Sequence, residues 1–270
     1  MDVLQVTHFT NLISSYLPGA HATLLNGIIF GFPIKADYQL YMMVKKVGLL
    51  PLVVLSGMNI SILFSLIDSF FNFLSKRMRI LLSAIFLAIF IYIVKPQAPI
   101  MRAAFMVYIT LVSTIAGRGI KPLYSLFISS ITIGIIWPEW ITSLSFLLSF
   151  FSTLGIVLFS QSDKPYNHNE SWFLRAIKAN IKISLSAQLL TIPLIFFYFH
   201  EIALLSPISN VLVTPFIGPL MMLGILAVLL GSIWWALGVI PAFICYGLVS
   251  VILAIITILS HIPHMFFSLT

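Results

Sequence analysis

The chain has 270 residues, of which 60% are hydrophobic and 8% are charged, and its formal net charge is +7. Soluble domains carry about 25% charged residues, so this composition excludes a soluble globular protein and indicates a polytopic membrane protein. The positive charge suits anionic lipid headgroups or an anionic solute. The single cysteine, Cys245, excludes a disulfide within the chain.

Residues 1–47 are moderately apolar and are interrupted by prolines and glycines. The amino terminus has no basic region followed by a long apolar run, so it is not a signal peptide. We expect amphipathic interfacial helices on the outer side of the membrane, with Lys45 and Lys46 reaching the headgroups. A transmembrane domain is expected over residues 48–270.

The first predicted span, about 48–74, has no charge between Leu49 and Ile67. Its polar residues fall on two helical stripes, one of Ser56 and Asn59 and the other of Ser61, Ser65, Asp68 and Asn72. Two interpretations stay open. The polar groups form interhelical hydrogen bonds, or the helix breaks at Ser56-Gly57 and lines an aqueous path. Asp68 is expected to pair with a basic residue.

Seven further spans are predicted: four at about 79–94, 100–117, 122–137 and 140–160, a helix that carries Arg175, Lys178 and Lys182 and runs apolar to about Phe199, and two at about 204–230 and 236–260. Pro207, Pro215 and Pro219 predict that the span at 204–230 is discontinuous, with a re-entrant pair of half-helices as the alternative. The expected fold is therefore all-α, a polytopic transmembrane helix bundle of about eight spans, one or more of them discontinuous.

Basic residues cluster at 76–79, 118–121 and 164–182, which are alternate loops. The positive-inside rule places these loops in the cytoplasm, and residues 1–47 therefore on the outer side. Arg175, Lys178 and Lys182 share one helical face. They are either ordinary flanking charges or a basic rail at the inner exit of a path.

Several short motifs occur in order along the chain: Pro18-Gly19-Ala20, Leu55-Ser56-Gly57-Met58-Asn59, Ala98-Pro99-Ile100-Met101-Arg102, Ala116-Gly117-Arg118, Gln188-Leu189-Leu190-Thr191-Ile192-Pro193 and Ser209-Asn210-Val211-Leu212-Val213-Thr214-Pro215. From about residue 18 to 230, this series resembles the competence domain of ComEC-type proteins, the inner-membrane DNA-uptake channel of natural transformation. The resemblance implies transport of single-stranded DNA through the cell inner (plasma) membrane to the cytoplasm.

Several features depart from that family. Both histidines typical of its Ser-Gly motif are absent, with Pro51 and Asn59 in that stretch. The oligonucleotide-binding and metallo-β-lactamase-like domains are missing, as is any His-x-His-x-Asp-His set. We therefore expect the channel part alone, with no enzymatic activity, cofactor or metal. Separate oligonucleotide-binding, nuclease and ATP-driven motor proteins are its expected partners.

A membrane path for DNA needs buried positive or hydrogen-bonding groups to replace water and counterions. The candidates for such a path are Ser56, Gly57, Asn59, Arg102, Gln188, Asn210, Lys178 and Lys182. Arg102 either faces protein or water inside the membrane or extends to the interface from its helix end. Asn210 either lines the path or bonds a neighbouring helix, and Ser149 with Thr153 is assigned to helix packing.

Two other functions stay open. A secondary transporter for a small anionic solute would use a proline-broken helix at 207–219 as its binding site. An intramembrane hydrolase with Ser56 as nucleophile would need a histidine base, yet every histidine lies in a terminal or loop region.

Overall fold

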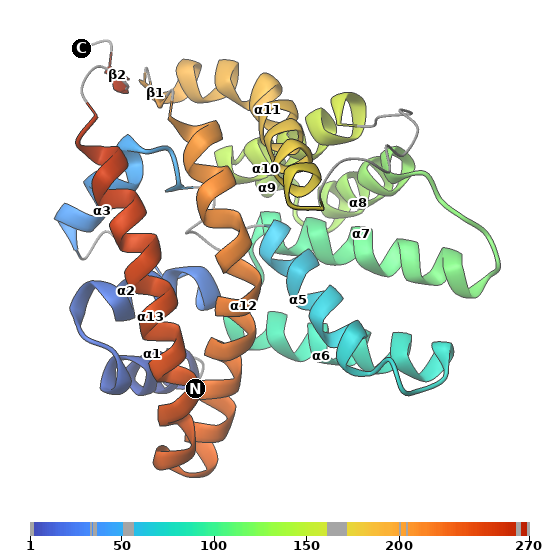
Figure 1. The fold of residues 1–270 in the computed structure, drawn as a ribbon. Helices are drawn as coiled ribbons and strands as arrows, with labels where there is room; N and C mark the ends of the chain where they lie inside the picture. Colours follow the sequence, from blue (N-terminus) through green and yellow to red (C-terminus); the bar gives the residue numbers. More distant parts are fainter. Residues whose placement is uncertain are drawn as a thin grey trace.

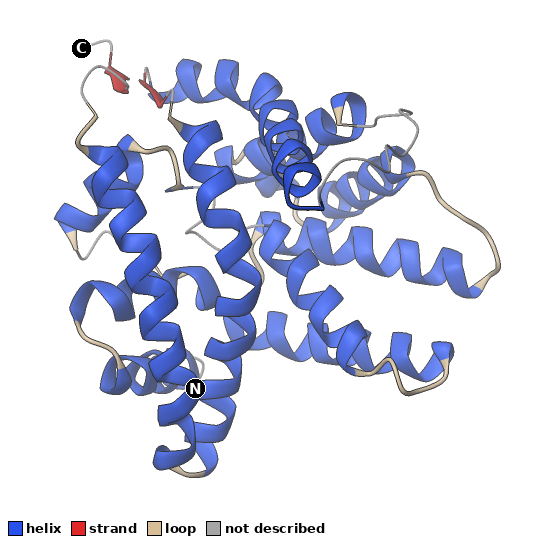
Figure 2. Ribbon diagram, in the orientation of Figure 1, coloured by secondary structure: helices blue, strands red, loops and turns tan. Residues whose placement is uncertain are grey.

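The computed structural model describes residues 3–32, 34, 37–50, 57–160, 172–199, 201–203, 205–262 and 266–268. These residues are mostly helical, with one pair of short strands (Figure 2). In chain order the elements are α1 (Val3–Tyr16), α2 (Gly19–Phe30), α3 (Tyr38–Lys46), α5 (Gly57–Phe70), α6 (Lys76–Val94), α7 (Ala98–Ile115), α8 (Pro122–Ile136), α9 (Pro138–Ile141), α10 (Leu144–Phe159), α11 (Trp172–Phe199), β1 (Glu201–Ala203), α12 (Ser206–Ile233), α13 (Trp235–Ser260) and β2 (Phe266–Ser268).

The predicted all-α membrane bundle is confirmed, and each predicted span overlaps a described helix: α5, α6, α7, α8, α10, α11, α12 and α13. By length and composition, four helices of the described chain can cross a membrane: α7, the Lys178–Tyr198 part of α11, α12 and α13. In contrast, α8 and α10 have 15 and 16 residues. They extend about 23 to 24 Å, less than the roughly 30 Å of a hydrocarbon core.

The local sequence explains where the shorter helices begin and end. Pro122 and Pro138 occupy the first turns of α8 and α9, where the missing N–H costs no helical hydrogen bond. The Ser143 hydroxyl caps α10 by accepting from Phe146 N at 3.2 Å. At the end of α7, Gly117 takes φ 71°, a conformation that glycine adopts without strain.

The predicted discontinuity at 207–219 is wrong, because α12 is one uninterrupted helix from Ser206 to Ile233 (Figure 1). Pro215 and Pro219 lie inside it. Each proline removes one backbone donor, but membrane helices accommodate proline where neighbouring helices support the freed carbonyls. Here α13 packs along α12, and α2, α5 and α11 also contact it. The transporter hypothesis therefore loses the broken helix that was to form its binding site.

The helices α12 and α13 form a hairpin with its turn at Trp234. At the opposite end, β1 and β2 pair antiparallel, a short sheet that hydropathy does not predict. The segment before α5 contacts both ends of this hairpin: Tyr16 Oη donates to Trp235 O at 2.7 Å, and Ser209 Oγ donates to Val47 O at 2.6 Å. The assignment of residues 1–47 to the outer membrane surface stays a prediction.

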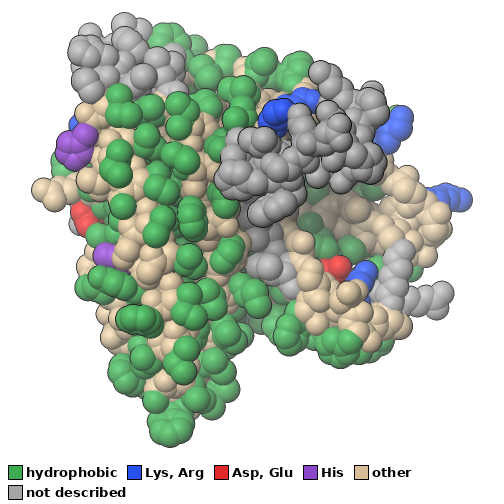
Figure 3. Space-filling model, in the orientation of Figure 1, with side chains coloured by type: hydrophobic (Ala, Val, Ile, Leu, Met, Phe, Trp, Pro, Cys, Tyr) green, Lys and Arg blue, Asp and Glu red, His purple; other side chains and the backbone are tan. Residues whose placement is uncertain are grey.

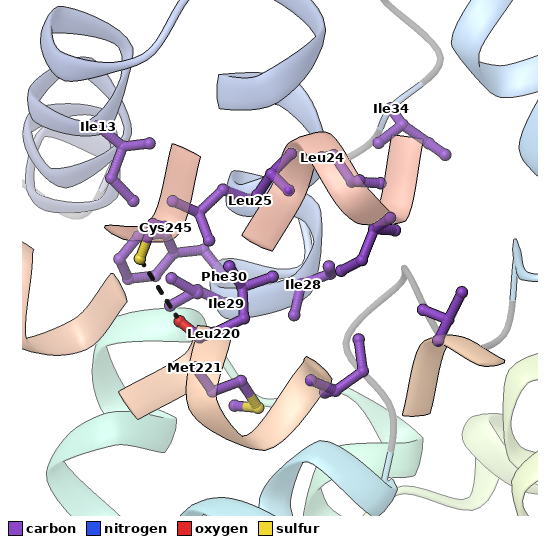
Figure 4. Packing of buried hydrophobic residues seen from close by; sticks show 14 of the residues in the cluster. Ile13, Leu24, Leu25, Ile28, Ile29, Phe30, Ile34, Leu220, Met221 and Cys245 are labelled. Atoms are coloured by element: carbon purple, nitrogen blue, oxygen red, sulfur yellow. Dashed lines mark hydrogen bonds between the residues drawn. The ribbon is translucent and has the colours of Figure 1, made fainter. Parts of the chain in front are cut away.

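The main hydrophobic core lies between α2 and the α12–α13 hairpin (Figure 4), and it continues to buried residues of α5, α6 and α7 such as Ile60, Leu87 and Ile100. Leu24, Ile28 and Ile29 of α2 are fully buried there, beside Met221 of α12. The Cys245 thiol of α13 points at Leu220 O, at 4.0 Å (Figure 4). This core joins the hairpin and the amino-terminal helices into one half of the molecule, which we call the hairpin half (α1–α3, α12 and α13).

The helices α5 to α11 form the other half, on the right of Figure 1. On the face shown in Figure 3, hydrophobic side chains cover the hairpin, and most of the visible Lys and Arg side chains lie over this second half. Charge is therefore distributed unevenly between the halves, as the sequence requires, because residues 202–270 contain no Lys, Arg, Asp or Glu.

Candidate functional site

Arg102 lies in the second turn of α7, and its side chain is 3% exposed. Its Nε and Nη2 atoms donate to Ser149 Oγ of α10 at 3.0 and 2.8 Å. Its Nη1 atom points at Met106 Sδ at 3.2 Å. Arg102 therefore faces the protein interior, and the alternative in which it extends to the membrane interface is wrong.

The charge of Arg102 has no carboxylate partner among the described residues. A guanidinium has five N–H donors, and these three contacts leave two without a described acceptor. An arginine at the centre of a membrane helix costs about 3 kcal/mol on insertion scales, and a hydrogen bond to a charged group returns about 1.5 to 3 kcal/mol. Ser149 can therefore hold the cation in place while leaving donors available for an anion.

Gly57, the first residue of α5, lies directly beside this guanidinium. A β-carbon at Gly57 would lie 3.2 Å from Arg102 Nη2 and 3.3 Å from Ala103 Cβ. A side chain at this position would therefore crowd the cation. The predicted path residues Gly57 and Arg102, which are 45 positions apart, thus meet in the structure.

The predicted path residues Gln188 and Asn210 also meet, in a second polar cluster between α11 and α12. Gln188 Nε2 donates to Ser184 Oγ at 3.0 Å and to Ser206 Oγ at 3.2 Å. Asn210 Nδ2 donates to the same two hydroxyls at 3.3 and 3.4 Å. We call Ser184, Gln188, Ser206 and Asn210 the amide cluster.

The amide cluster is tied to the chain just before α5. Ser206 Oγ donates to Gly48 O at 3.1 Å. Gly48 has φ +72°, and a β-carbon there would lie 2.6 Å from Ser206 Cβ, so glycine is needed both for conformation and for space. Residues 51–56, which include the predicted path residue Ser56, lie outside the described chain.

The helix α10 connects the two polar places. Ser149 and Gly155 are six residues apart on it, which is about 9 Å along the helix axis. Gly155 packs against the backbone of Ser186, whose carbonyl oxygen a β-carbon at Gly155 would overlap. Ser186 lies between Ser184 and Gln188 in sequence, so α10 meets α11 at the level of the amide cluster but on the opposite side of α11.

The predicted basic rail shares α11 with the amide cluster. Lys178 is exposed and lies about two turns before Ser186, and Lys182 is partly buried and lies about one turn before it. The side chain of Arg175 lies outside the described part. The helix α11 thus carries basic residues toward one end and the amide cluster in its middle.

Asn59 is placed apart from these residues. It is fully buried, and its Nδ2 atom donates to Ile28 O of α2 at 3.2 Å. It therefore faces the hydrophobic core of the hairpin half, while Gly57, two residues earlier, faces Arg102. A rotation of about 100° per residue puts two such positions on nearly opposite sides of a helix.

The expectation for Asp68 has a structural outcome. Asp68 pairs with a basic residue as predicted, because Arg79 Nε lies 2.9 Å from Asp68 Oδ1 and Arg79 Nη1 donates to Asn72 Oδ1 at 2.7 Å. Within the described ranges, no three His, Cys, Asp or Glu side chains are grouped so that they could hold a metal ion.

Sequence reasoning missed three residues of these clusters. Ser149 was assigned to helix packing, and Ser184 and Ser206 were not singled out. The spacings Ser184–Gln188 and Ser206–Asn210, each of four residues, place both pairs on one helical face and contain the signal that could have found them.

Comparisons with known proteins agree with the resemblance seen in the motifs. The family model described as "Competence protein" matches residues 28–270. The chain is 21% identical over 217 residues to ComE operon protein 3 of Bacillus subtilis (strain 168), a match covering 77% of this chain and 26% of that relative. The chain thus spans about a quarter of the curated relative's length. No solved structure gives a significant match.

Proposed function

The chain belongs to the competence protein family, and we propose that it forms a conduit for single-stranded DNA through the cell inner membrane during natural transformation. It is a competence-related membrane protein with four helices that can cross a bilayer. In this proposal it crosses the membrane several times and has no catalytic step of its own. Separate proteins supply oligonucleotide binding, nuclease activity and ATP-driven force.

The observation that carries the proposal is the buried Arg102, which has no carboxylate partner in the described part of the chain. A strand of DNA has one phosphate charge per nucleotide, so a conduit needs cations that are not already neutralised. The two unused N–H donors of Arg102 suit phosphate oxygens, which guanidinium groups bind in pairs of parallel hydrogen bonds. Gly57 lets the guanidinium lie close to the start of α5, and Lys178 and Lys182 add positive charge on α11.

The experiment is to replace Arg102 by Gln, which keeps a polar side chain and removes the charge. We expect R102Q to abolish DNA uptake while the protein still inserts and accumulates in the membrane. Transformation frequency and the internalisation of labelled DNA measure uptake. Immunoblotting of the membrane fraction measures how much protein accumulates there. R102K, which keeps the charge but loses the paired geometry, should retain part of the uptake.

Wild-type transformation by R102Q would remove Arg102 from the mechanism and, with it, the main support for a polyanion path. Loss of uptake together with loss of the protein from the membrane would instead assign Arg102 to folding, because Ser149 and Met106 are its contacts.

A further inference from the structure

We propose that the amide cluster binds nucleobases, so that Gln188 and Asn210 accept hydrogen bonds from base N–H groups while Arg102 holds the phosphates. This inference rests on the proposed function, since it names the part of the strand that a second site in the same conduit contacts. It starts from two amide oxygens, Gln188 Oε1 and Asn210 Oδ1.

The orientation of both amides is fixed by the single proton of Ser206. That hydroxyl donates its proton to Gly48 O, so it can only accept from its other neighbours. The NH2 groups of Gln188 and Asn210 therefore face Ser206, and their oxygens point away from it. The cluster presents acceptors, not donors, to anything that approaches.

Neither oxygen has a partner among the described residues. The bonds found for Gln188 and Asn210 all use their nitrogen atoms. Both side chains are partly exposed, and neither oxygen is among the buried atoms that lack a partner. Two accessible acceptors are therefore held in place at membrane depth, where an unused polar group is costly.

The chemistry of these acceptors selects bases over phosphates. An amide oxygen repels a phosphate oxygen, but it accepts from the exocyclic amines of adenine, cytosine and guanine and from the ring N–H of thymine and guanine. Every base has at least one such donor, so the contact tolerates any sequence. Ser149, the partner of Arg102, and Gln188 belong to the packed helices α10 and α11, and in this proposal one strand contacts both helices.

The test measures binding of labelled single strands to the full chain in lipid nanodiscs. The probes are an oligothymidylate and an abasic strand of the same length, which keeps the phosphates and lacks the bases. We expect wild type to bind the oligothymidylate more tightly. The double variant Gln188→Met and Asn210→Leu should lower that affinity, by about fivefold for each lost hydrogen bond, and leave abasic binding unchanged.

Gln97→Met is the matched control, because Gln97 is an exposed glutamine at the start of α7. It should leave the preference for bases intact. A double variant that keeps the wild-type preference for bases would overturn the inference. If wild type binds neither strand, or if R102Q leaves the binding of both unchanged, the proposed function fails instead.

A second measurement leaves the protein unaltered, in case the double variant does not fold. N3-methylation of thymine removes its ring N–H donor and keeps the ring. Wild type should bind an N3-methylthymidylate strand about as weakly as the abasic one. Equal binding of methylated and unmethylated strands would overturn the inference.

Discussion

The hairpin half and the α5–α11 half are held together in different ways. In the hairpin half, helices meet through an apolar core, close glycine contacts such as Gly224 against Ile29, and neutral hydrogen bonds such as Tyr16 Oη to Trp235 O. In the other half, Gly155 packs as closely against Ser186, but α7 and α10 meet through a buried cation and a hydroxyl. Close contacts through small residues, as in the hairpin half, are typical of helices that associate permanently in a membrane.

The difference indicates a division of roles. A dry interface with small residues has one well-packed arrangement, whereas hydrogen bonds to hydroxyls can be exchanged for bonds to a solute. We therefore interpret the hairpin half as the scaffold and the α5–α11 half, with its border on α12, as the part that contacts the transported strand. The following substitutions test that division, in order of expected effect.

Gly155→Ala should have the largest effect, because its β-carbon would overlap the backbone carbonyl of Ser186 and no side-chain rotation relieves that. Separating α10 from α11 also separates Arg102's partner from the amide cluster. We expect a loss of about 3 kcal/mol in the free energy of unfolding, together with loss of DNA uptake. Thermal unfolding in detergent measures the change in stability, and transformation assays measure DNA uptake.

The matched control is Gly247→Ala in α13, where a β-carbon would meet nothing within 4 Å. This variant should lower neither the free energy of unfolding nor DNA uptake, since alanine favours helix over glycine by about 1 kcal/mol. Normal uptake by G155A at normal abundance would contradict the close α10–α11 contact.

Ser149→Ala should follow, with a loss of about 2 kcal/mol. The substitution removes the acceptor for two Arg102 N–H groups and leaves the charge buried. Thr153→Val is the control one turn further along α10, because the bond found for that hydroxyl among the described residues goes to Ser149 O in its own helix. If the two variants unfold at the same temperature, Ser149 does not stabilise Arg102.

Gly238→Ala tests the scaffold, and we expect a loss of about 1.5 kcal/mol. Its β-carbon would lie 2.8 Å from Ala227 O and 2.5 Å from Tyr16 Oη, but the tyrosine side chain can move. The amount of protein in the membrane should fall, and DNA uptake per molecule should not. A fall in uptake per molecule would break the division between scaffold and strand-contacting half.

The sequence predicted the order and approximate positions of the apolar helices, because long apolar runs and charged loops are local features; of the eight predicted spans, four described helices are long and apolar enough to cross a membrane. It failed at α12, where three prolines in a short stretch predicted a break. Their cost depends on the neighbours of the helix, and residues 206–233 alone contain no information about α13, α2, α5 and α11.

For the site, the sequence identified Arg102, Gln188 and Asn210 as polar residues that need a reason to be in a membrane. It could not identify their partners, because Ser149 is 47 residues from Arg102 and Ser206 is 18 residues from Gln188. Which face of α5 meets α7 also depends on tertiary packing, so Gly57 and Asn59 were grouped although they face different helices.

The smallest effect should come from Asp68→Asn, at the periphery of the α5–α11 half. The Asp68 and Arg79 side chains are 29% and 25% exposed, so water and salt screen their interaction. An exposed ion pair contributes about 0.2 to 1 kcal/mol, and Arg79 keeps its bond to Asn72. We expect wild-type DNA uptake and a change below about 1 kcal/mol that shrinks further in high salt. A loss of uptake would mean that charge outside the two polar clusters also contacts the strand, and the strand-contacting surface would then have to extend along α5 to its far end.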